Sequence, residues 1–431
     1  METVSRERRK AQVLKRLETS PYRGRKDRNP SAVQGTCEWF ISHHLYHEWP
    51  GQEASKILWV SADPGCGKSV LVKRLVDSVI QTTASRKVCY FFFKDDFADQ
   101  KSHFSALSSI LQQLFMLDTA LLSDEILLQF DANGRWLAAS FVELWQILIK
   151  VADRNPDTEI ICLIDAVDEC NEQERRQLFK ALCELCGSKK SLNLKFIITS
   201  RPYREIGVGF KPLENLNLPV IHLSGESDSE MRKIVKEIDI AIRERVKKIT
   251  VQQSLTDDEQ LILVSRLLSV RNRTYLWAHR TLDLIERQLE ISKEKIINIT
   301  SHLPQNVNEA YERILCRTFS KDKATRMLHL IIAADRPLTV GEMVVVIELQ
   351  HHHQSIDDIE IEPEDRFREK IRDICGLVTV SESRIFLLHQ TVKDFLISMD
   401  HSEPTSLSWK HSVLVQDPNL TLTYVCVWCL Q

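Results

Sequence analysis

Residues 61–71, which read SADPGCGKSVL, contain the residue types that hold a phosphate group. Gly65 and Gly67 would let the backbone turn tightly enough to point its N–H groups at an anion. Lys68 adds a positive charge that can reach terminal phosphates, and the hydroxyl of Ser69 suits Mg²⁺. A helix expected to begin near Lys68 would direct its positive end at the same place. The pattern predicts a loop that binds the phosphates of a nucleotide.

The loop departs from the usual pattern G-x-x-x-x-G-K-[ST] at one position, because Ala62 stands where the first glycine is expected. That glycine mainly sets a turn, and Pro64 with Gly65 can set one instead. Taken alone, the segment is compatible with a chance match, with a loop that has lost its nucleotide and with a working site. In a working site the phosphate cradle would run from Pro64 through Cys66 to Val70.

A second group of polar residues follows an apolar run in residues 160–170, IICLIDAVDEC. Asp165 stands at the end of the expected strand, where a carboxylate can hold Mg²⁺ directly or through water. Asp168 and Glu169 lie just beyond, where a carboxylate could orient or deprotonate an attacking water. Acids after a buried strand are also typical of an ordinary solvated loop, so this motif needs support from elsewhere.

A third motif ends the next expected strand, in residues 196–202, FIITSRP. It places Thr199, Ser200 and Arg201 at the carboxyl end of the strand, the edge at which α/β proteins bind ligands. The planar guanidinium of Arg201 could sense or stabilise a γ-phosphate. The alternative is a surface arginine before a proline turn. Three motifs that each end their own strand favour one shared site over coincidence.

Alternating strands and helices must position these motifs. Short apolar runs bounded by turn residues predict strands, and helical spacing of apolar residues predicts helices between them. Continuous apolar strands of this kind are typical of a parallel sheet covered on both faces. The sequence therefore predicts a three-layer α/β fold of the P-loop NTPase type. The expected strands are 57–62, 87–93, 159–167, 194–200 and 219–223, and expected helices include 68–81, 102–117 and 141–152.

The rest of the chain is expected to be mainly helical. Residues 376–397 read as strand, polar turn, strand and helix after several helices, which predicts a winged helix. The predicted organisation is an N-terminal arm 1–35, an NTPase domain 36–226, a helical domain 227–303, a winged helix 304–405 and a further helical region 406–431 that reads as truncated.

Composition limits the classes of partner. The net charge is −3, which gives no support for a nucleic-acid-binding surface. No run approaches the ~20 apolar residues that a membrane helix needs, and residues 1–20 do not resemble a signal peptide. The 11 cysteines are an odd number and several fall inside expected strands or helices, which favours free thiols in a reducing compartment and predicts a cytoplasmic protein.

Cys183 and Cys186 have a spacing that zinc sites also use. Packing of both residues on one helix explains this spacing without zinc.

The order of motifs SADPGCGKS, LIDAVDEC, FIITSRP and LLHQTVKDFL resembles the NACHT-type ATPases of the STAND class. The similarity is greatest to the fungal group with a nephrocystin-like N-terminal NTPase domain, and it extends from about residue 36 to residue 400. In that group the loop often begins Ala-Asp-Pro-Gly, so the resemblance implies that Ala62 is a family variant.

The resemblance also implies an architecture and a mechanism. Such proteins hold ADP between the NTPase domain, a small helical domain and a winged helix, and they open when ATP replaces ADP. The family's phosphate, magnesium and sensor positions fall on Lys68, Ser69, Asp165 and Arg201. His389 falls where NACHT proteins place a histidine against the ADP β-phosphate, a role that suits a protonatable imidazole. The alternative for His389 is a hydrogen-bonded histidine of the core or an interface.

Two departures from the family are visible. Many relatives carry a proline at the base site, whereas the comparable stretch here, RNRTYLWAHR at 271–280, has none and Pro304 is a less natural match. No residue is therefore assigned to adenine. Relatives usually add an effector before this core and repeats after it, and their absence here predicts either a truncated chain or a minimal variant.

These expectations combine into a function. The predicted protein is a signalling switch that binds ADP or ATP with Mg²⁺, hydrolyses ATP slowly and self-associates on activation. The alternative is a nucleotide-binding interaction scaffold that does not hydrolyse ATP. A phosphotransferase is disfavoured, because three acids after the third strand suit water activation and no arginine-rich lid is evident.

Overall fold

The chain is seen in a computed structural model, in which two compact units are distinguished, Met1–Ala241 and Ile242–Gln431. The boundary between them falls inside one long helix, so the domain limits predicted from the sequence remain predictions. The residues that the structure describes are 2–49, 57–137, 140–188, 192–202, 220–223, 228–270, 273–286, 294, 296, 303–304, 306–316, 318, 320–349, 355–397, 408–413 and 416–429.

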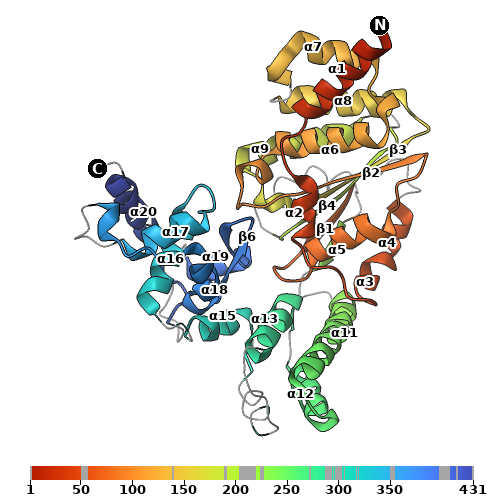
Figure 1. The fold of residues 1–431 in the computed structure, drawn as a ribbon. Coiled ribbons are helices and arrows are strands. Elements are labelled where there is room, and N and C mark those ends of the chain that lie inside the picture. The colour runs from red at the N-terminus through yellow and green to blue at the C-terminus, as the bar shows by residue number, and fades with distance from the viewer. Residues whose placement is uncertain are drawn as a thin grey trace. The chain divides into compact units, whose positions relative to one another are not determined.

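The first unit is built on a five-stranded sheet in the order β2-β3-β4-β1-β5, and every neighbouring pair is parallel (Figure 1). Its strands lie where the apolar runs predict them, which confirms the α/β fold class. β4 lies between β1 and β3, so the segments that follow these three strands meet at one edge. The strands are β1 Ile57–Ala62, β2 Arg86–Phe92, β3 Glu159–Asp165, β4 Leu194–Ser200 and β5 Val220–Leu223.

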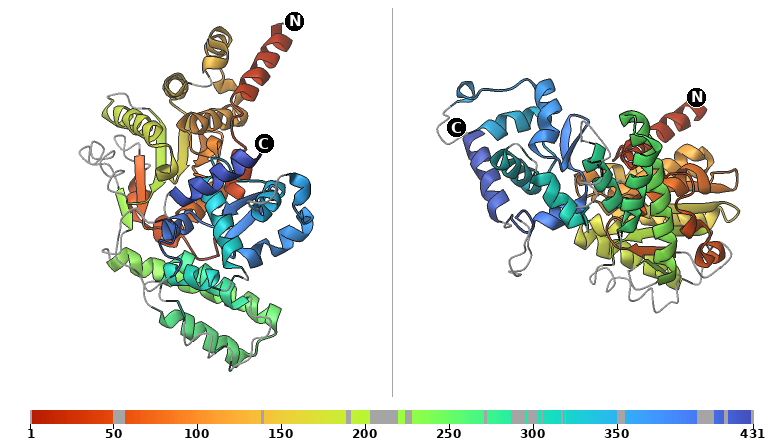
Figure 2. Two further views of the ribbon diagram at one scale, coloured as in Figure 1. Left: turned by 90° about the vertical axis from the view of Figure 1, so that its left-hand side faces the viewer. Right: turned by 90° about the horizontal axis from the view of Figure 1, so that it is seen from below.

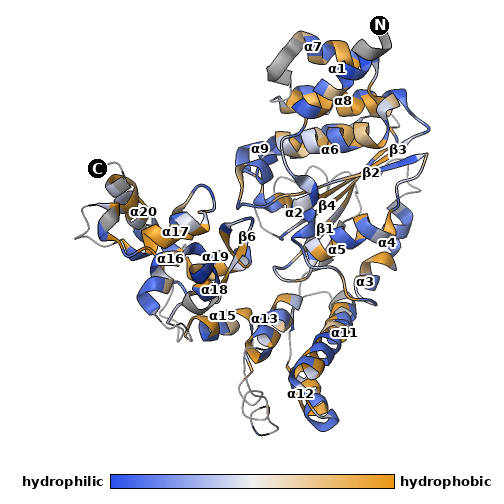
Figure 3. Ribbon diagram, viewed as in Figure 1, coloured by the Kyte–Doolittle hydropathy of each residue, from blue (hydrophilic) through white to orange (hydrophobic). Residues whose placement is uncertain are grey.

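Helices cover both faces of this sheet, with α6, α8 and α9 on one side and α3 to α5 on the other (Figure 1). Hydrophobic and hydrophilic stripes along α6 and α8 show why each turns one face to the interior (Figure 3). The helices are α1 Glu2–Arg16, α2 Tyr22–Asp27, α3 Glu38–Ile41, α4 His44–Glu48, α5 Lys68–Arg74, α6 His103–Leu117, α7 Asp124–Leu137, α8 Phe141–Arg154 and α9 Glu172–Gly187, with a π-helical turn at Leu75–Val79 and 3₁₀ turns at Ala98–Gln100, Thr119–Leu121 and Val167–Glu169.

The alternation of side chains along β3 decides where its acids point. Ile160, Cys162 and Ile164 are buried in the core formed with α6, α8 and α9. Because strand side chains alternate between faces, Leu163 and Asp165 point the other way, toward the side of α5. Asp165, at the end of β3, therefore lies on the face of the sheet where α5 begins after the glycine-rich loop.

Part of the segment predicted as an N-terminal arm, residues 1–35, contributes to the core of the first unit. Val13 and Leu17 are 1% and 0% exposed and belong to the same core cluster as the sheet. α1 packs beside α6 and α7 (Figures 1 and 2). The many basic residues of α1 made this core contribution difficult to predict from the sequence, because only a narrow apolar stripe of the helix faces inward.

The second unit is mainly helical and contains the C-terminal hairpin (Figure 2). Among the described residues, no helix is long and apolar enough to cross a membrane. Its elements begin within α11 Asp228–Gln253 and continue with α12 Asp257–Ser269, α13 Tyr275–Glu286, α15 Val307–Leu315, α16 Lys321–Ala333, α17 Val340–Glu348, a 3₁₀ turn at Ile356–Asp358, α18 Glu364–Ile374, β6 Val378–Ser381, β7 Arg384–Leu387, α19 Gln390–Leu396 and α20 Gln416–Cys429.

The hairpin confirms the winged helix expected from residues 376–397. β6 and β7 pair antiparallel through a two-residue turn at Glu382 and Ser383, whose φ angles are 50° and 57°. Positive φ at both central positions is the conformation that matches the twist of a tight hairpin. α19 follows the hairpin directly and buries Phe395 and Leu396 in the core of this unit.

Candidate nucleotide-binding site

The loop after β1 turns at Pro64 and Gly65, beyond position 62, where the usual pattern has its first glycine. The N–H of Cys66 donates to the carbonyl of Asp63 across the turn (3.3 Å). Gly65 has a φ of 81°, so proline and glycine occupy the positions that they favour in a type II turn. Ala62 is the last residue of β1 and has no positive φ. The turn therefore requires no glycine at position 62.

Gly67 opens the helix behind the loop. Its φ of 84° lies in the left-handed region, which an L side chain adopts only with strain, and α5 begins at the next residue. Gly67 therefore makes a second bend in the backbone, two residues after the bend at Gly65. The loop thus has the two consecutive bends needed to aim N–H groups at an anion in front of a helix N-terminus. Burial raises the pKa of the Cys66 thiol to about 11, so no thiolate competes with a phosphate there.

Lys68 folds back over this loop. Its Nζ donates to the carbonyls of Ala62 (2.6 Å) and Asp63 (3.1 Å). Burial lowers the pKa of Lys68, and the nearby carboxylates of Asp168 and Asp165 oppose that shift. The ammonium group therefore lies in the same electrostatic environment as both acids, although about a hundred residues of sequence intervene.

Asp165 is held in place from two sides. Its Oδ1 accepts a hydrogen bond from the hydroxyl of Thr199 (2.6 Å), and the side chain of Ser69 also hydrogen-bonds to it. Thr199 in turn accepts from the N–H of Ala166 (2.9 Å), whose φ is 53°. Burial raises the pKa of Asp165, and both hydroxyl partners oppose this shift. The end of β4 thus orients the carboxylate that ends β3.

Arg201 and Asp168 form a buried ion pair at the same edge. The Nε atom of Arg201 lies 3.3 Å from Oδ2 of Asp168, and the Arg201 N–H donates to Oδ1 (3.1 Å). Their side chains are only 6% and 4% exposed. The arginine is therefore part of the polar cluster and is not a surface residue before a proline turn.

Glu169 lies next to this pair and has a partner that the sequence did not indicate. Its Oε2 accepts from the N–H of Asp95, in the segment that follows β2 (3.1 Å). Burial, reinforced by the charge of Asp168, raises the pKa of Glu169 to about 8. The contact with Asp95 is a backbone one, so no residue type could have revealed it.

The cluster fits a magnesium nucleotide by the chemistry of its donors. Ser69 and Asp165 are already hydrogen-bonded to each other, and a hydroxyl with a carboxylate is a donor set that Mg²⁺ accepts. Lys68 and Arg201 supply positive charge beside them, and the two left-handed glycines supply backbone N–H groups. The loop, the acids and the arginine therefore lie at one edge of the sheet, as the sequence predicted.

His389 belongs to the second unit, where it caps α19. Its Nδ1 accepts from the N–H of Thr391 (3.2 Å) and lies 2.9 Å from the Thr391 hydroxyl. Tyr311 extends the chain of hydrogen bonds by a contact to the same hydroxyl (2.7 Å). The capping bond leaves Nδ1 without a proton, so a neutral ring carries its proton on Nε2. The expected contact of His389 with a nucleotide remains a prediction.

The parallel sheet with a glycine-turned loop between β1 and α5 defines the first unit as a P-loop NTPase domain. Sequence comparisons agree with this class. Residues 35–201 match the family described as nephrocystin 3, N-terminal, and residues 311–406 match the winged helix domain of GPI inositol-deacylase.

Curated relatives come from fungi. Vegetative incompatibility protein HET-E-1 of Podospora anserina is 23% identical over 369 residues, which are 83% of this chain and 26% of that protein. Azaphilone pigments biosynthesis cluster protein L of Monascus ruber is 26% identical over 168 residues, 37% of this chain and 35% of that protein. The chain therefore spans only about a quarter to a third of the length of these relatives.

Similarity to solved structures is more distant. Cdc6p from Pyrobaculum aerophilum aligns with 85% of this chain and 94% of its own at 12% identity and a TM-score of 0.39. The family matches and the similarity to HET-E-1 support a fungal NACHT-type NTPase, the class that the motif order resembled.

Proposed function

We propose that this chain is a nucleotide-dependent signalling switch that binds ADP or ATP with Mg²⁺ and hydrolyses ATP slowly. The observation that carries the proposal is the shared environment of Lys68, Asp165 and Arg201 at one sheet edge. Its relatives include an incompatibility protein, which supports a role in signalling. The nucleotide state would control self-association, as a switch requires two states with different contacts.

Each part of the cluster has a role in this proposal. The N–H groups of the loop from Pro64 to Val70 and the ammonium of Lys68 hold the phosphates. Ser69 and Asp165 hold Mg²⁺, which supplies charge neutralisation when it is bound. Asp168 and Glu169 orient the water that attacks the γ-phosphate.

Arg201 would act as the sensor of the γ-phosphate. In the described structure its charge is engaged by Asp168. A γ-phosphate would compete for the guanidinium, which prefers a planar pair of oxygen acceptors. Exchange of the carboxylate for the phosphate would report that ATP has replaced ADP.

A binding experiment tests the site. Calorimetry of the purified chain with Mg·ADP and Mg·ATP should show uptake that Lys68→Ala abolishes. Lys180→Ala, which removes an exposed lysine of α9, is the matched control and should bind like the wild type. Equal binding by the Lys68→Ala variant would refute the proposed site.

One observation favours the non-hydrolysing scaffold as a second candidate. A pKa of about 8 keeps most Glu169 side chains protonated at neutral pH, and a protonated carboxyl cannot accept a proton from water. Phosphate release that disappears in Glu169→Gln, with ATP binding retained, supports the switch. Tight binding of ATP without any release supports the scaffold.

His389 is proposed to contact the ADP β-phosphate from the winged helix. Because His389 also caps α19, His389→Ala would disturb the helix as well as any contact with nucleotide. His389→Asn preserves a good capping residue and removes the imidazole. Faster release of ADP from both variants supports the contact, whereas unchanged release from His389→Asn removes the residue from the site.

A cytoplasmic location is proposed from the thiols. All ten cysteines whose state is described are free, and five of them are buried in the first unit. Free thiols are typical of a reducing compartment. Fractionation of cells that express the tagged chain would test this.

A further inference from the structure

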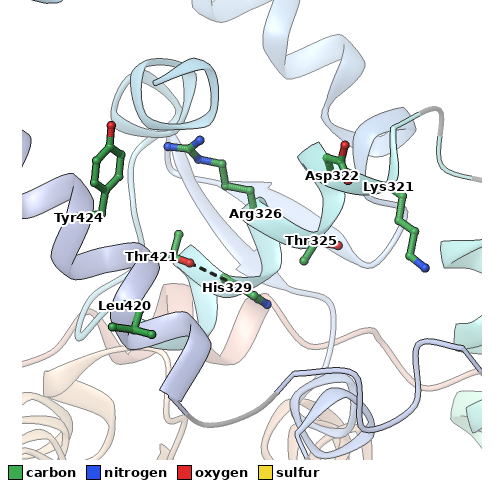
Figure 4. Close-up of a pocket in the computed structure, with 8 residues that line it drawn as sticks. All are labelled: Lys321, Asp322, Thr325, Arg326, His329, Leu420, Thr421 and Tyr424. Atoms are coloured by element: carbon green, nitrogen blue, oxygen red, sulfur yellow. Dashed lines mark hydrogen bonds between the residues drawn. The ribbon is translucent and has the colours of Figure 1, made fainter. Parts of the chain in front are cut away.

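A pocket of about 460 Å³ lies between α16 and α20 in the second unit (Figure 4). It belongs to the same unit as the hairpin and contains none of the residues assigned to the nucleotide. Five of its lining residues come from α16 and three from α20. They are Lys321, Asp322, Thr325, Arg326, His329, Leu420, Thr421 and Tyr424.

The pocket exists because each helix turns a polar face to it and an apolar face to the core. The α16 residues recur at helical spacing along one side of the helix. Met327 and Leu328 on its other side are completely buried, and Val425 anchors α20 to the same core. The polar lining is therefore held on two helices that are fixed by packing elsewhere.

Arg326 brings an uncompensated charge to this pocket. Its Nε and Nη2 atoms are buried and have no hydrogen-bond partner in the described part of the chain. The carboxylate of Glu348 in this region is paired with Lys323. Burial lowers the pKa of Arg326, because no carboxylate close by fully offsets the loss of water. A guanidinium whose Nε and Nη2 are buried without hydrogen-bond partners is unfavourable, and the charge of Glu348 offsets this only in part. A ligand that supplies an anion would therefore improve the site.

The remaining lining groups are mostly hydrogen-bond donors. His329 Nδ1 lies 3.3 Å from the hydroxyl of Thr421, and Figure 4 shows Arg326 extending from α16 toward Tyr424. Lys321 adds a second full positive charge near the rim, with its Nζ 5.3 Å from the centroid of the Trp409 ring. Asp322 is the one carboxylate of the lining, and in Figure 4 it lies toward the Lys321 end.

We propose that this pocket binds a small molecule that carries a phosphate group, with Arg326 as its main anchor. The guanidinium offers a planar fork for two phosphate oxygens. The hydroxyls of Thr325 and Tyr424 line the pocket as further donors, while the Thr421 hydroxyl donates to the carbonyl of Asp417 (3.0 Å) and holds His329 beside the pocket. A phosphate with its several oxygens can use such donors better than a carboxylate. The site is independent of the loop after β1 and does not require the proposed switch.

Phosphate binding is tested in a Lys68→Ala background, so that the loop after β1 contributes as little as possible. The probes are inorganic phosphate and pyrophosphate, compared with sodium chloride at equal ionic strength. Both probes should raise the melting temperature of this protein above the chloride value. The imidazole NMR signals of His329 should show a higher pKa when the anion is bound, because nearby negative charge favours the protonated ring.

Arg326→Gln in the same background should weaken the binding of pyrophosphate about tenfold or more, as expected for loss of a charge-assisted hydrogen bond. Thr421→Val provides a second variant that retains every charge and should weaken binding less. Arg366→Gln is the control, because its side chain is 66% exposed on α18 and lies outside the pocket lining. Equal stabilisation of Arg326→Gln, or a response to phosphate no larger than to chloride, overturns the proposal.

Discussion

Arg201 and Asp168 are 33 positions apart in the chain, yet the Nε of one lies 3.3 Å from Oδ2 of the other at the ends of β4 and β3. Both side chains are almost completely buried, so the loss of either charge would be costly for the other. The N–H of Arg201 also binds Asp168, which fixes the carboxylate before any nucleotide arrives. The arginine proposed as the sensor and Asp168, proposed to orient the water, therefore hold each other in position.

Asp168→Asn should destabilise the first unit by about 3–5 kcal/mol, because it removes the carboxylate that is ion-paired with the buried guanidinium of Arg201. The asparagine oxygen can still accept from the Arg201 N–H, so most of this loss is electrostatic. Urea denaturation measures it.

The double variant Asp168→Asn with Arg201→Gln is the key comparison. Removal of both charges should recover part of the lost stability, since the two members of the ion pair are then removed together. Strictly additive losses in the double variant would show that the two side chains do not act as a pair.

Gly67→Ala should abolish nucleotide binding and reduce stability by about 1–2 kcal/mol, because an L residue is strained in the left-handed conformation. The glycine has a φ of 84°. Gly187→Ala is the matched control: a Cβ there meets nothing within 4 Å and its φ is not positive. Wild-type affinity for ATP in Gly67→Ala would show that the second bend is not required.

The sheet and its polar edge were predictable because strong local signals point to them. The continuous apolar runs of β1, β3 and β4 leave few alternatives to buried parallel strands, and the motifs end at their carboxyl ends. Pro64 and Gly65 indicated the turn, and in the structure they occupy the two central positions of a type II turn, which these residue types favour. Asp165 could be assigned from the sequence because the last residue of a parallel strand lies at the carboxyl edge of the sheet.

Other features depend on tertiary contacts that no local pattern encodes. The N–H of Asp95 binds Glu169 through the backbone, so the residue type at position 95 carries no signal. The basic surface of α1 masked Val13 and Leu17, whose burial depends on α6 and α7 being folded. The burial of the Arg326 guanidinium without hydrogen-bond partners arises in the folded second unit, where α20 packs beside α16.

The pH dependence of stability should reveal Glu169. Its pKa is about 8 in the folded protein, above the ordinary value of 4.5. Between these two values the unfolded chain releases a proton that the folded chain keeps, so stability falls as pH rises, by at most about 1.4 kcal/mol per pH unit. Glu169→Gln mimics the neutral acid and should match the wild type near pH 4 but melt at a higher temperature at pH 8.

Glu172→Gln is the control for this titration, because its side chain is 62% exposed at the start of α9. It should retain the wild-type slope of stability against pH. Parallel melting curves for Glu169→Gln and the wild type from pH 5 to pH 9 would exclude an elevated pKa at position 169.

The winged helix contains a separate test of the fold at the start of α17. The Thr339 hydroxyl accepts from the N–H of Glu342 (3.1 Å), and the Glu342 carboxylate accepts from the N–H of Thr339 (2.8 Å), a reciprocal capping box. Thr339→Ala should cost about 1 kcal/mol of stability in the second unit, since the helix loses one of its capped N–H groups. Thr339→Ser keeps the hydroxyl and should lose much less. Chemical denaturation followed by tryptophan fluorescence, compared across the two variants, measures the difference. Equal stability of both would show that the box does not hold the helix start.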